Sequence, residues 1–129
     1  MNEAGLVADA SAVLALLVGE PITRFDPERI ATASISTVNL AEVLTRLHEI
    51  GMPESDATVA VARLNLQIVA FDEPQARAVA RLRATTRHIG LSLGDRACLA
   101  LGESLGYPVV TADRIWAGLR IGVKIALIR

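Results

Sequence analysis

Hydrophobic residues in this chain come in short runs that alternate with longer stretches of helical spacing. The short runs predict buried strands at residues 6–8, 33–36, 67–71, 109–111 and 123–128. The helical spacing predicts helices at residues 12–18, 27–31, 37–50, 53–64, 73–87 and 94–105, with one further turn near Trp116. Short apolar strands alternating with helices are typical of parallel βαβ units, so we expect an α/β layered fold.

Local signals set the expected helix boundaries and faces. Ser11 is the expected N-cap of the 12–18 helix, and Ser36 or Thr37 that of the 37–50 helix. The first helix is expected to break at Gly19 and Pro21. The residues expected to face inward are Leu40, Val43, Leu44 and Leu47 in the 37–50 helix, and Ala76, Val79, Ala80 and Leu82 in the 73–87 helix.

Composition limits the class of protein. The 129 residues are 52% hydrophobic and only 3% aromatic, which predicts a single domain over residues 1–129 with an aliphatic core. No apolar run approaches the roughly 20 residues of a membrane span, and the N-terminus has no secretory signal pattern, so we expect a cytoplasmic protein. Cys98 is the single cysteine, which excludes a disulfide framework and predicts a core position.

Charge is distributed unevenly, although the formal net charge is only −1. Residues 1–60 carry three basic and nine acidic side chains, whereas residues 61–129 carry ten basic and five acidic ones. All but one of the thirteen basic residues are arginine, whose planar guanidinium suits phosphate and carboxylate alike. This polarity is compatible with an RNA-binding face or with an acidic protein partner, and does not choose between them.

Three acids are expected at one edge of the sheet. Asp9 ends the first strand, Asp113 follows the fourth, and Asp95 begins the helix that enters the fourth strand. Ligands bind at the carboxyl ends of parallel strands where strand order reverses, so the three carboxylates would converge there. Each acid also has a purely structural interpretation, as a strand-end residue, a first-turn helix acid and a turn cap respectively. Their joint placement favours a site.

Glu42 would not be selected by periodicity. On the 37–50 helix it projects opposite Leu40 and Leu44, one turn before Arg46. A solvated, salt-bridged glutamate is the natural interpretation of that position, contributing only about 0.3–0.5 kcal/mol.

Four segments carry a family resemblance: VADAS at 7–11, STVNLAEV at 36–43, LSLGDRACLALG at 91–102 and VVTADRIWA at 109–117. With them the chain resembles PIN-domain ribonucleases, in particular VapC-type toxins of toxin–antitoxin pairs. The resemblance implies a parallel sheet of four or five strands flanked by helices. It implies that Mg²⁺ or Mn²⁺ is held by the four catalytic acids Asp9, Glu42, Asp95 and Asp113. It further implies that Ser11, Asn39 and Thr111 lie beside them. Ile115 stands where some PIN proteins carry a further acid, which leaves the number of metal ions open.

The resemblance also implies a reaction. A hard cation relieves the repulsion among packed carboxylates, and Mg²⁺ keeps waters of which one can attack a phosphorus atom in line. The expected activity is endoribonuclease cleavage that leaves a 5′-phosphate and a 3′-hydroxyl. The candidates for positioning RNA phosphates are Arg77, Arg81, Arg83, Arg87, Arg96 and Arg114, although a solvated helix face explains several of them equally well.

The expected partners are RNA, a cognate VapB-type antitoxin and a second copy of the chain. Candidates for the antitoxin groove are apolar residues of the helices at 11–18, 27–31 and 37–64, including Leu14, Leu17, Ile22, Phe25 and Ile30, although core packing explains many of them too. Two alternatives keep the fold: a PIN nuclease of RNA processing, and a non-catalytic PIN-like binding module. A phosphoacceptor receiver domain would use Asp9, Asp72, Thr111 and Lys124, but it lacks the paired acid near the first strand and leaves Asp95 and Asp113 unexplained.

Overall fold

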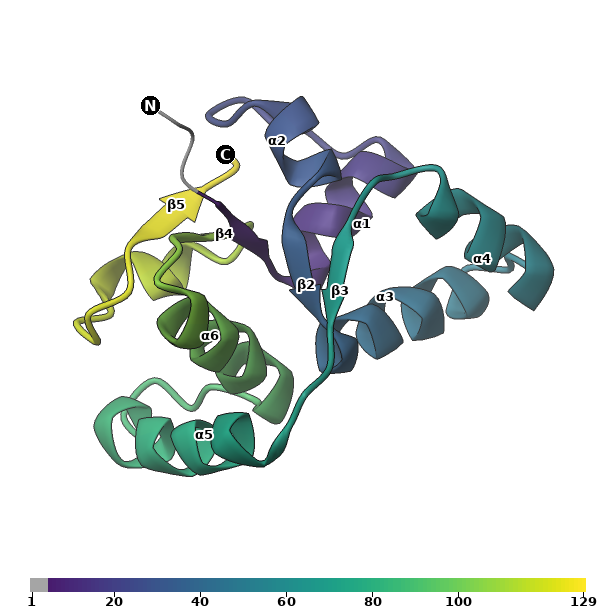
Figure 1. The fold of residues 1–129 in the computed structure, drawn as a ribbon. Coiled ribbons are helices and arrows are strands. Elements are labelled where there is room, and N and C mark those ends of the chain that lie inside the picture. The colour runs from purple at the N-terminus through teal and green to yellow at the C-terminus, as the bar shows by residue number, and fades with distance from the viewer. Residues whose placement is uncertain (1–4) are drawn as a thin grey trace.

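Five short parallel strands form the centre of the computed structural model, which describes residues 5–129 (Figure 1). They are β1 (Val7–Ala8), β2 (Ser34–Ser36), β3 (Gln67–Val69), β4 (Val109–Thr111) and β5 (Ile125–Leu127). Their order is β3-β2-β1-β4-β5, so strand order reverses between β1 and β4. Val7 pairs with Ser34 on one side and Val109 on the other. The carboxyl ends of β1 and β4 therefore form the switch point that the sequence predicted.

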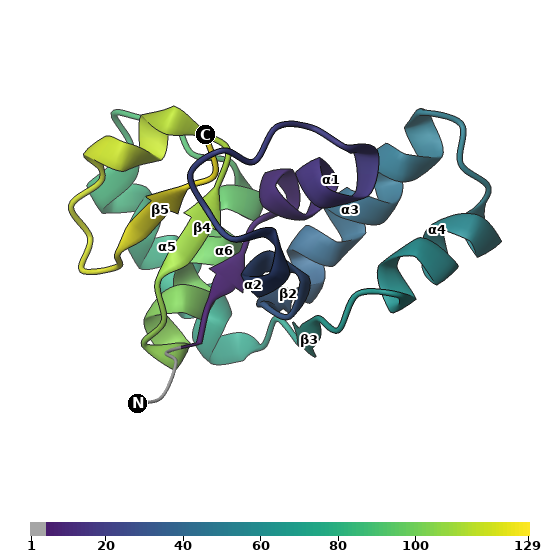
Figure 2. The same ribbon diagram turned by 90° about the horizontal axis from the view of Figure 1, so that it is seen from above.

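Helices cover both faces of this sheet. The six α-helices are α1 (Ala10–Val18), α2 (Pro27–Ala31), α3 (Thr37–Glu49), α4 (Glu54–Ala62), α5 (Glu73–Thr86) and α6 (Leu93–Leu105), and η1 (Arg114–Gly118) is a 3₁₀-helix. In the two ribbon views α1 and α2 lie on one side of the sheet and α5 and α6 on the other, while α3 and α4 extend outward beyond it (Figures 1 and 2). The predicted α/β fold, a parallel sheet flanked by helices, is confirmed.

The core divides into two layers because side chains alternate across each strand. Ala8 and Val110 pack with α1, α2 and α3, whereas Val7 and Val109 pack with α5 and α6. Trp116 is fully buried in the second layer, where it packs as an anchor. Cys98 is buried in that layer as predicted, and its surroundings raise the pKa of its thiol, mainly through desolvation.

Several expected boundaries are corrected. Ser11 was wrong as the N-cap of the first helix: Asp9 is the cap, and its carboxylate accepts from the N–H of Ala12. Strand β3 ends at Val69 and does not reach Phe71, whose N–H donates instead to the hydroxyl of Thr37. The last strand is shorter than 123–128, and residues 1–4 of the expected domain lie outside the described residues. No helix among residues 5–129 is long and apolar enough to span a membrane.

The buried face of α5 is rotated from the expected one. Ala76 and Ala80 are exposed, while Ala78 is buried beside the correctly predicted Val79 and Leu82. Alanines populate all sides of this helix, so the stripe cannot be fixed from apolar spacing alone. Ile30, a candidate for the antitoxin groove, is also corrected, because it is fully buried in the core and offers no surface.

Candidate functional site

Four carboxylates from four different elements line one cavity at the switch point. The cavity has a volume of ≈ 280 Å³ and is lined by Asp9, Ala10, Ser11, Leu14, Asn39, Glu42, Asp95 and Asp113. The acids come from the end of β1, from α3, from the first turn of α6 and from the start of η1. The structure thus brings all four predicted acids together, along with Ser11 and Asn39. No basic side chain is among these lining residues.

Asp9 is the most enclosed of the four acids, with only 6% of its surface exposed. One of its oxygens accepts from the N–H of Ala12 at 2.9 Å, and the other accepts from the hydroxyl of Thr111 at 2.6 Å. Desolvation raises the pKa of Asp9 to about 6, against the lowering effect of these hydrogen bonds, and the charge of Asp95 raises it further. Asp9 is therefore a carboxylate that gains from the arrival of positive charge.

Two hydroxyls join Asp9 to the segment that carries Asp113. The hydroxyl of Ser11 lies 2.7 Å from Asp9 Oδ1 and accepts from the N–H of Ala112 at 2.9 Å. The hydroxyl of Thr111, which donates to Asp9, accepts from the N–H of Asp113 at 3.0 Å. Thr111 is fully buried and Ser11 partly so. This network fixes the loop after β4 relative to the end of β1, so that both acids face the same cavity.

Asp95 and Asp113 are held by helix-capping contacts. Asp95 accepts from the N–H of Ser92 at 3.0 Å, and Ser92 in turn caps α6, which makes a capping box. Asp113 accepts from the N–H of Ile115 at 3.0 Å and is the N-cap of η1. The structural interpretations considered for these two acids are thus correct as geometry. Each of these two capping contacts uses one oxygen of its carboxylate, so the second oxygen is left for a ligand.

Glu42 reaches the cavity from α3 by crossing to α6. Its Oε1 accepts from Asn39 Nδ2 at 2.9 Å, and the same amide nitrogen donates to the carbonyl of Gly94 at 3.0 Å. A Cβ built on Gly94 would collide with the Glu42 carboxylate. Gly94 was not predicted as a site residue, although a glycine directly before Asp95 is a visible signal because glycine is unfavourable within a helix.

The donor set fits a hard divalent cation. Carboxylate oxygens are the ligands that Mg²⁺ prefers, and Asn39 Oδ1 is a buried acceptor on the cavity wall without a hydrogen-bond partner among residues 5–129. The acids are not gathered as tightly as a loaded site requires: among the described residues, no three His, Cys, Asp or Glu side chains already form a group that could hold a metal ion. Asp95 and Asp113 are engaged in capping contacts instead.

The candidate arginines lie elsewhere. Arg77 pairs with Glu73 on α5, and Arg81 reaches Glu103 on α6. The other exposed candidates are Arg83, Arg87 and Arg114, of which Arg114 directly follows Asp113. Arg96 is half-buried and donates to the carbonyl of Val79 at 3.0 Å, which ties α6 to α5. None of these arginines lines the acidic cavity.

Comparison with known families identifies the fold around this cavity. A family model described as the PIN domain matches residues 6–121, a span that contains all four acids. The chain belongs to the PIN-domain family. Among the curated proteins compared, none matches this PIN domain.

Solved structures agree with this PIN domain over nearly its whole length. The DNA-bound VapBC structure from Salmonella typhimurium has a TM-score of 0.73 at 17% identity, covering 98% of this chain and 100% of that chain. VapC20 of Mycobacterium tuberculosis, a toxin that cleaves the sarcin–ricin loop, has a TM-score of 0.71 at 16% identity, covering 93% and 99%. A toxin–antitoxin complex from Klebsiella pneumoniae has a TM-score of 0.65 at 19% identity, covering 92% and 94%. These TM-scores establish a shared fold, and at identities this low they establish the fold alone.

Proposed function

We propose that this PIN domain is a divalent-metal-dependent endoribonuclease that acts as the toxin of a toxin–antitoxin pair. One observation carries the proposal: Asp9, Glu42, Asp95 and Asp113 come from separate elements and line one cavity. Membership of the PIN family and a fold shared with VapC20 and VapBC chains support this reaction class. Mg²⁺ or Mn²⁺, held by these acids, would supply Lewis-acid activation of water and neutralise charge on the phosphate.

Electrostatics supports a cation between the protein and its substrate. A phosphodiester is an anion, and a cavity lined by four acids without a basic side chain repels it. Positive charge bound by the acids reverses that repulsion. The same charge would bring Asp9, whose pKa is raised to about 6, fully into its ionised form.

The protein's own residues have distinct roles in this proposal. Thr111 and Ser11 orient the Asp9 carboxylate through their hydroxyls, and the amide of Asn39 orients Glu42. The caps at Ser92 and Ile115 hold Asp95 and Asp113 at the cavity rim. Arg114, exposed and adjacent to Asp113, is the candidate arginine best placed to contact an RNA phosphate at this rim.

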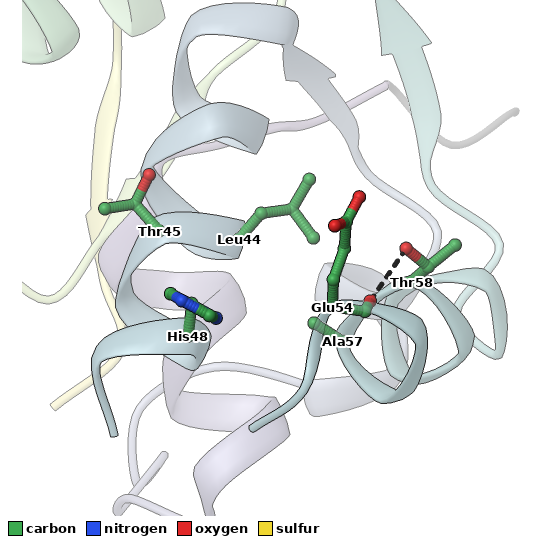
Figure 3. Close-up of a pocket in the computed structure, with 6 residues that line it drawn as sticks. All are labelled: Leu44, Thr45, His48, Glu54, Ala57 and Thr58. Atoms are coloured by element: carbon green, nitrogen blue, oxygen red, sulfur yellow. Dashed lines mark hydrogen bonds between the residues drawn. The ribbon is translucent and has the colours of Figure 1, made fainter. Parts of the chain in front are cut away.

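The partner we propose is a VapB-type antitoxin that docks between α3 and α4. A cavity of ≈ 310 Å³ lies there, lined by Leu44, Thr45, His48, Glu54, Ala57 and Thr58 (Figure 3). The α3–α4 arm extends from the sheet in both ribbon views (Figures 1 and 2). Because the first 60 residues are strongly acidic, we expect a segment with apolar and basic side chains there. A homodimer, implied by the resemblance, stays a prediction.

RNA cleavage by the purified protein tests the nuclease. We expect cleavage of total RNA that requires Mg²⁺ or Mn²⁺ and stops on chelation. Asp95→Asn should lower the initial rate by more than about 100-fold, because it removes a charged ligand while its amide oxygen can still accept from Ser92. Glu103→Gln is the matched control, since Glu103 lies on the same helix outside the cavity. Equal cleavage by wild type and Asp95→Asn would mean a contaminating nuclease and would contradict the proposal.

Two further arms separate the alternatives. Expression in a bacterial host should arrest growth, and coexpression of the antitoxin should restore it. Cleavage without growth arrest would favour a nuclease of RNA processing. Absence of cleavage, with binding to RNA retained, would favour a non-catalytic module.

A further inference from the structure

Gly94 is a glycine whose backbone conformation does not require one. Its φ is not positive, and it lies within the first turn of α6, where alanine is the more favourable residue. The space beside it is taken up by another side chain. The three atoms nearest to a Cβ built on Gly94 all belong to the Glu42 carboxylate, and the contact would be a clash. The carboxylate of Glu42 therefore occupies the place that a side chain at position 94 would take.

Asn39 bridges Glu42 and Gly94 with the two N–H groups of its side-chain amide. Nδ2 donates to Glu42 Oε1 at 2.9 Å and to the Gly94 carbonyl at 3.0 Å. Asn39 is 1% exposed, so its amide is shielded from competing water. The carboxylate and the backbone against which it lies are thus held by one buried group, although positions 39 and 94 are distant in the sequence.

We propose that Gly94 is a positioning residue for Glu42. Because Gly94 has no side chain, the Glu42 carboxylate can lie against the first turn of α6 and reach the same cavity as Asp95. Glu42 is otherwise exposed on a helix that carries no other acid of the cavity. A side chain at position 94 would push the carboxylate off this turn and toward solvent. The consequence for metal binding rests on the proposed function, whereas the position of Glu42 does not.

The test is a cycle of Gly94→Ala and Glu42→Ala, measured for Mn²⁺ affinity by calorimetry and for melting temperature in chelator. Gly94→Ala should weaken Mn²⁺ binding by about 10-fold or more, as expected when the group that orients a ligand is lost. In the Glu42→Ala background the same change should have no further effect on affinity. Gly118→Ala is the matched control, because a Cβ there meets nothing within 4 Å and its φ is not positive.

The melting temperature without metal tests the contact between Gly94 and Glu42 directly. If Gly94 makes room for Glu42, Gly94→Ala should be better tolerated when Glu42 is truncated, so the two changes are not additive in chelator. Additive melting shifts, or an unchanged Mn²⁺ affinity in Gly94→Ala, would overturn the inference. If the unmodified protein binds no Mn²⁺, the proposed function fails instead, and the metal-free cycle alone decides whether Gly94 positions Glu42.

Discussion

At the scale of single residues, the acids of this site are also parts of the fold. Asp9 caps α1, Asp113 caps η1 and Asp95 completes the capping box of α6. A helix N-terminus presents free N–H groups and a partial positive charge, so it holds a carboxylate in a fixed place. Structural and functional interpretations of these acids are therefore not alternatives. The cap fixes the carboxylate, and the convergence of three helix starts produces the cavity.

Asp9 should make stability depend on pH in the metal-free protein. Its pKa is raised from 3.8 to about 6, so its contribution is most favourable below about pH 4 and is lost as pH rises through 6. The shift corresponds to about 3 kcal/mol by pH 7. We expect the free energy of unfolding of Asp9→Asn, minus that of wild type, to increase between pH 4 and 7 by up to this amount. Denaturant unfolding in chelator measures it.

Ser92→Ala provides the control for this titration, because it removes a cap near the site without touching Asp9. Its unfolding free energy should differ from that of wild type by about 1 kcal/mol at every pH in this range. A difference between Asp9→Asn and wild type that stays flat with pH would contradict the raised pKa.

At the scale of elements, α3 serves both the cavity and the proposed antitoxin groove. Its first half carries Asn39 and Glu42, and its second half, with Leu44 and His48, forms one wall of the groove (Figure 3). A partner seated between α3 and α4 would therefore lie on the same helix as one of the acids. Helix α3 would therefore link binding at this groove to the acids of the cavity.

Thr58→Arg should impair antitoxin binding at the groove without affecting the acidic cavity. Thr58 lines the groove, and its hydroxyl donates to the carbonyl of Glu54 within its own helix. A basic side chain at position 58 would fill the groove and repel a basic partner. We expect antitoxin affinity to fall by about 10-fold or more, with metal-dependent RNA cleavage unchanged. Val59→Arg places the same charge one residue away, outside the groove lining, and should bind normally. Equal loss in both variants would place the antitoxin elsewhere.

The sequence predicted those features that depend on local pattern. The parallel α/β fold and the three acids at one edge of its sheet follow from the apolar runs and from where each run ends, whereas the order of the strands comes from the structure. Features set by contacts between distant segments were missed. Periodicity correctly predicted an exposed Glu42 but not its contact with Gly94, because Gly94 lies on another helix. The contact of Arg96 was missed for the same reason, since the carbonyl it bonds belongs to α5.

At the scale of the whole molecule, the acids impose a cost that a cation would remove. The clearest part of this cost is at Asp9, whose carboxylate is desolvated by burial and lies near the charge of Asp95. Binding that favours the folded state stabilises it by mass action, by about 2.7 kcal/mol when free metal is 100 times its dissociation constant. For a domain of this size that corresponds to a rise of roughly 10 °C in melting temperature.

We therefore expect Mn²⁺ to raise the melting temperature of the wild-type protein, and chelation to restore the lower value. Asp95→Asn should show little of this rise, whereas Glu103→Gln should show all of it, because Asp95 lines the cavity and Glu103 does not. Thermal melts at several Mn²⁺ concentrations also give the dissociation constant without any RNA present. A rise of equal size in both variants would mean that the ion binds away from the four acids, and the metal centre proposed for this cavity would have to be abandoned.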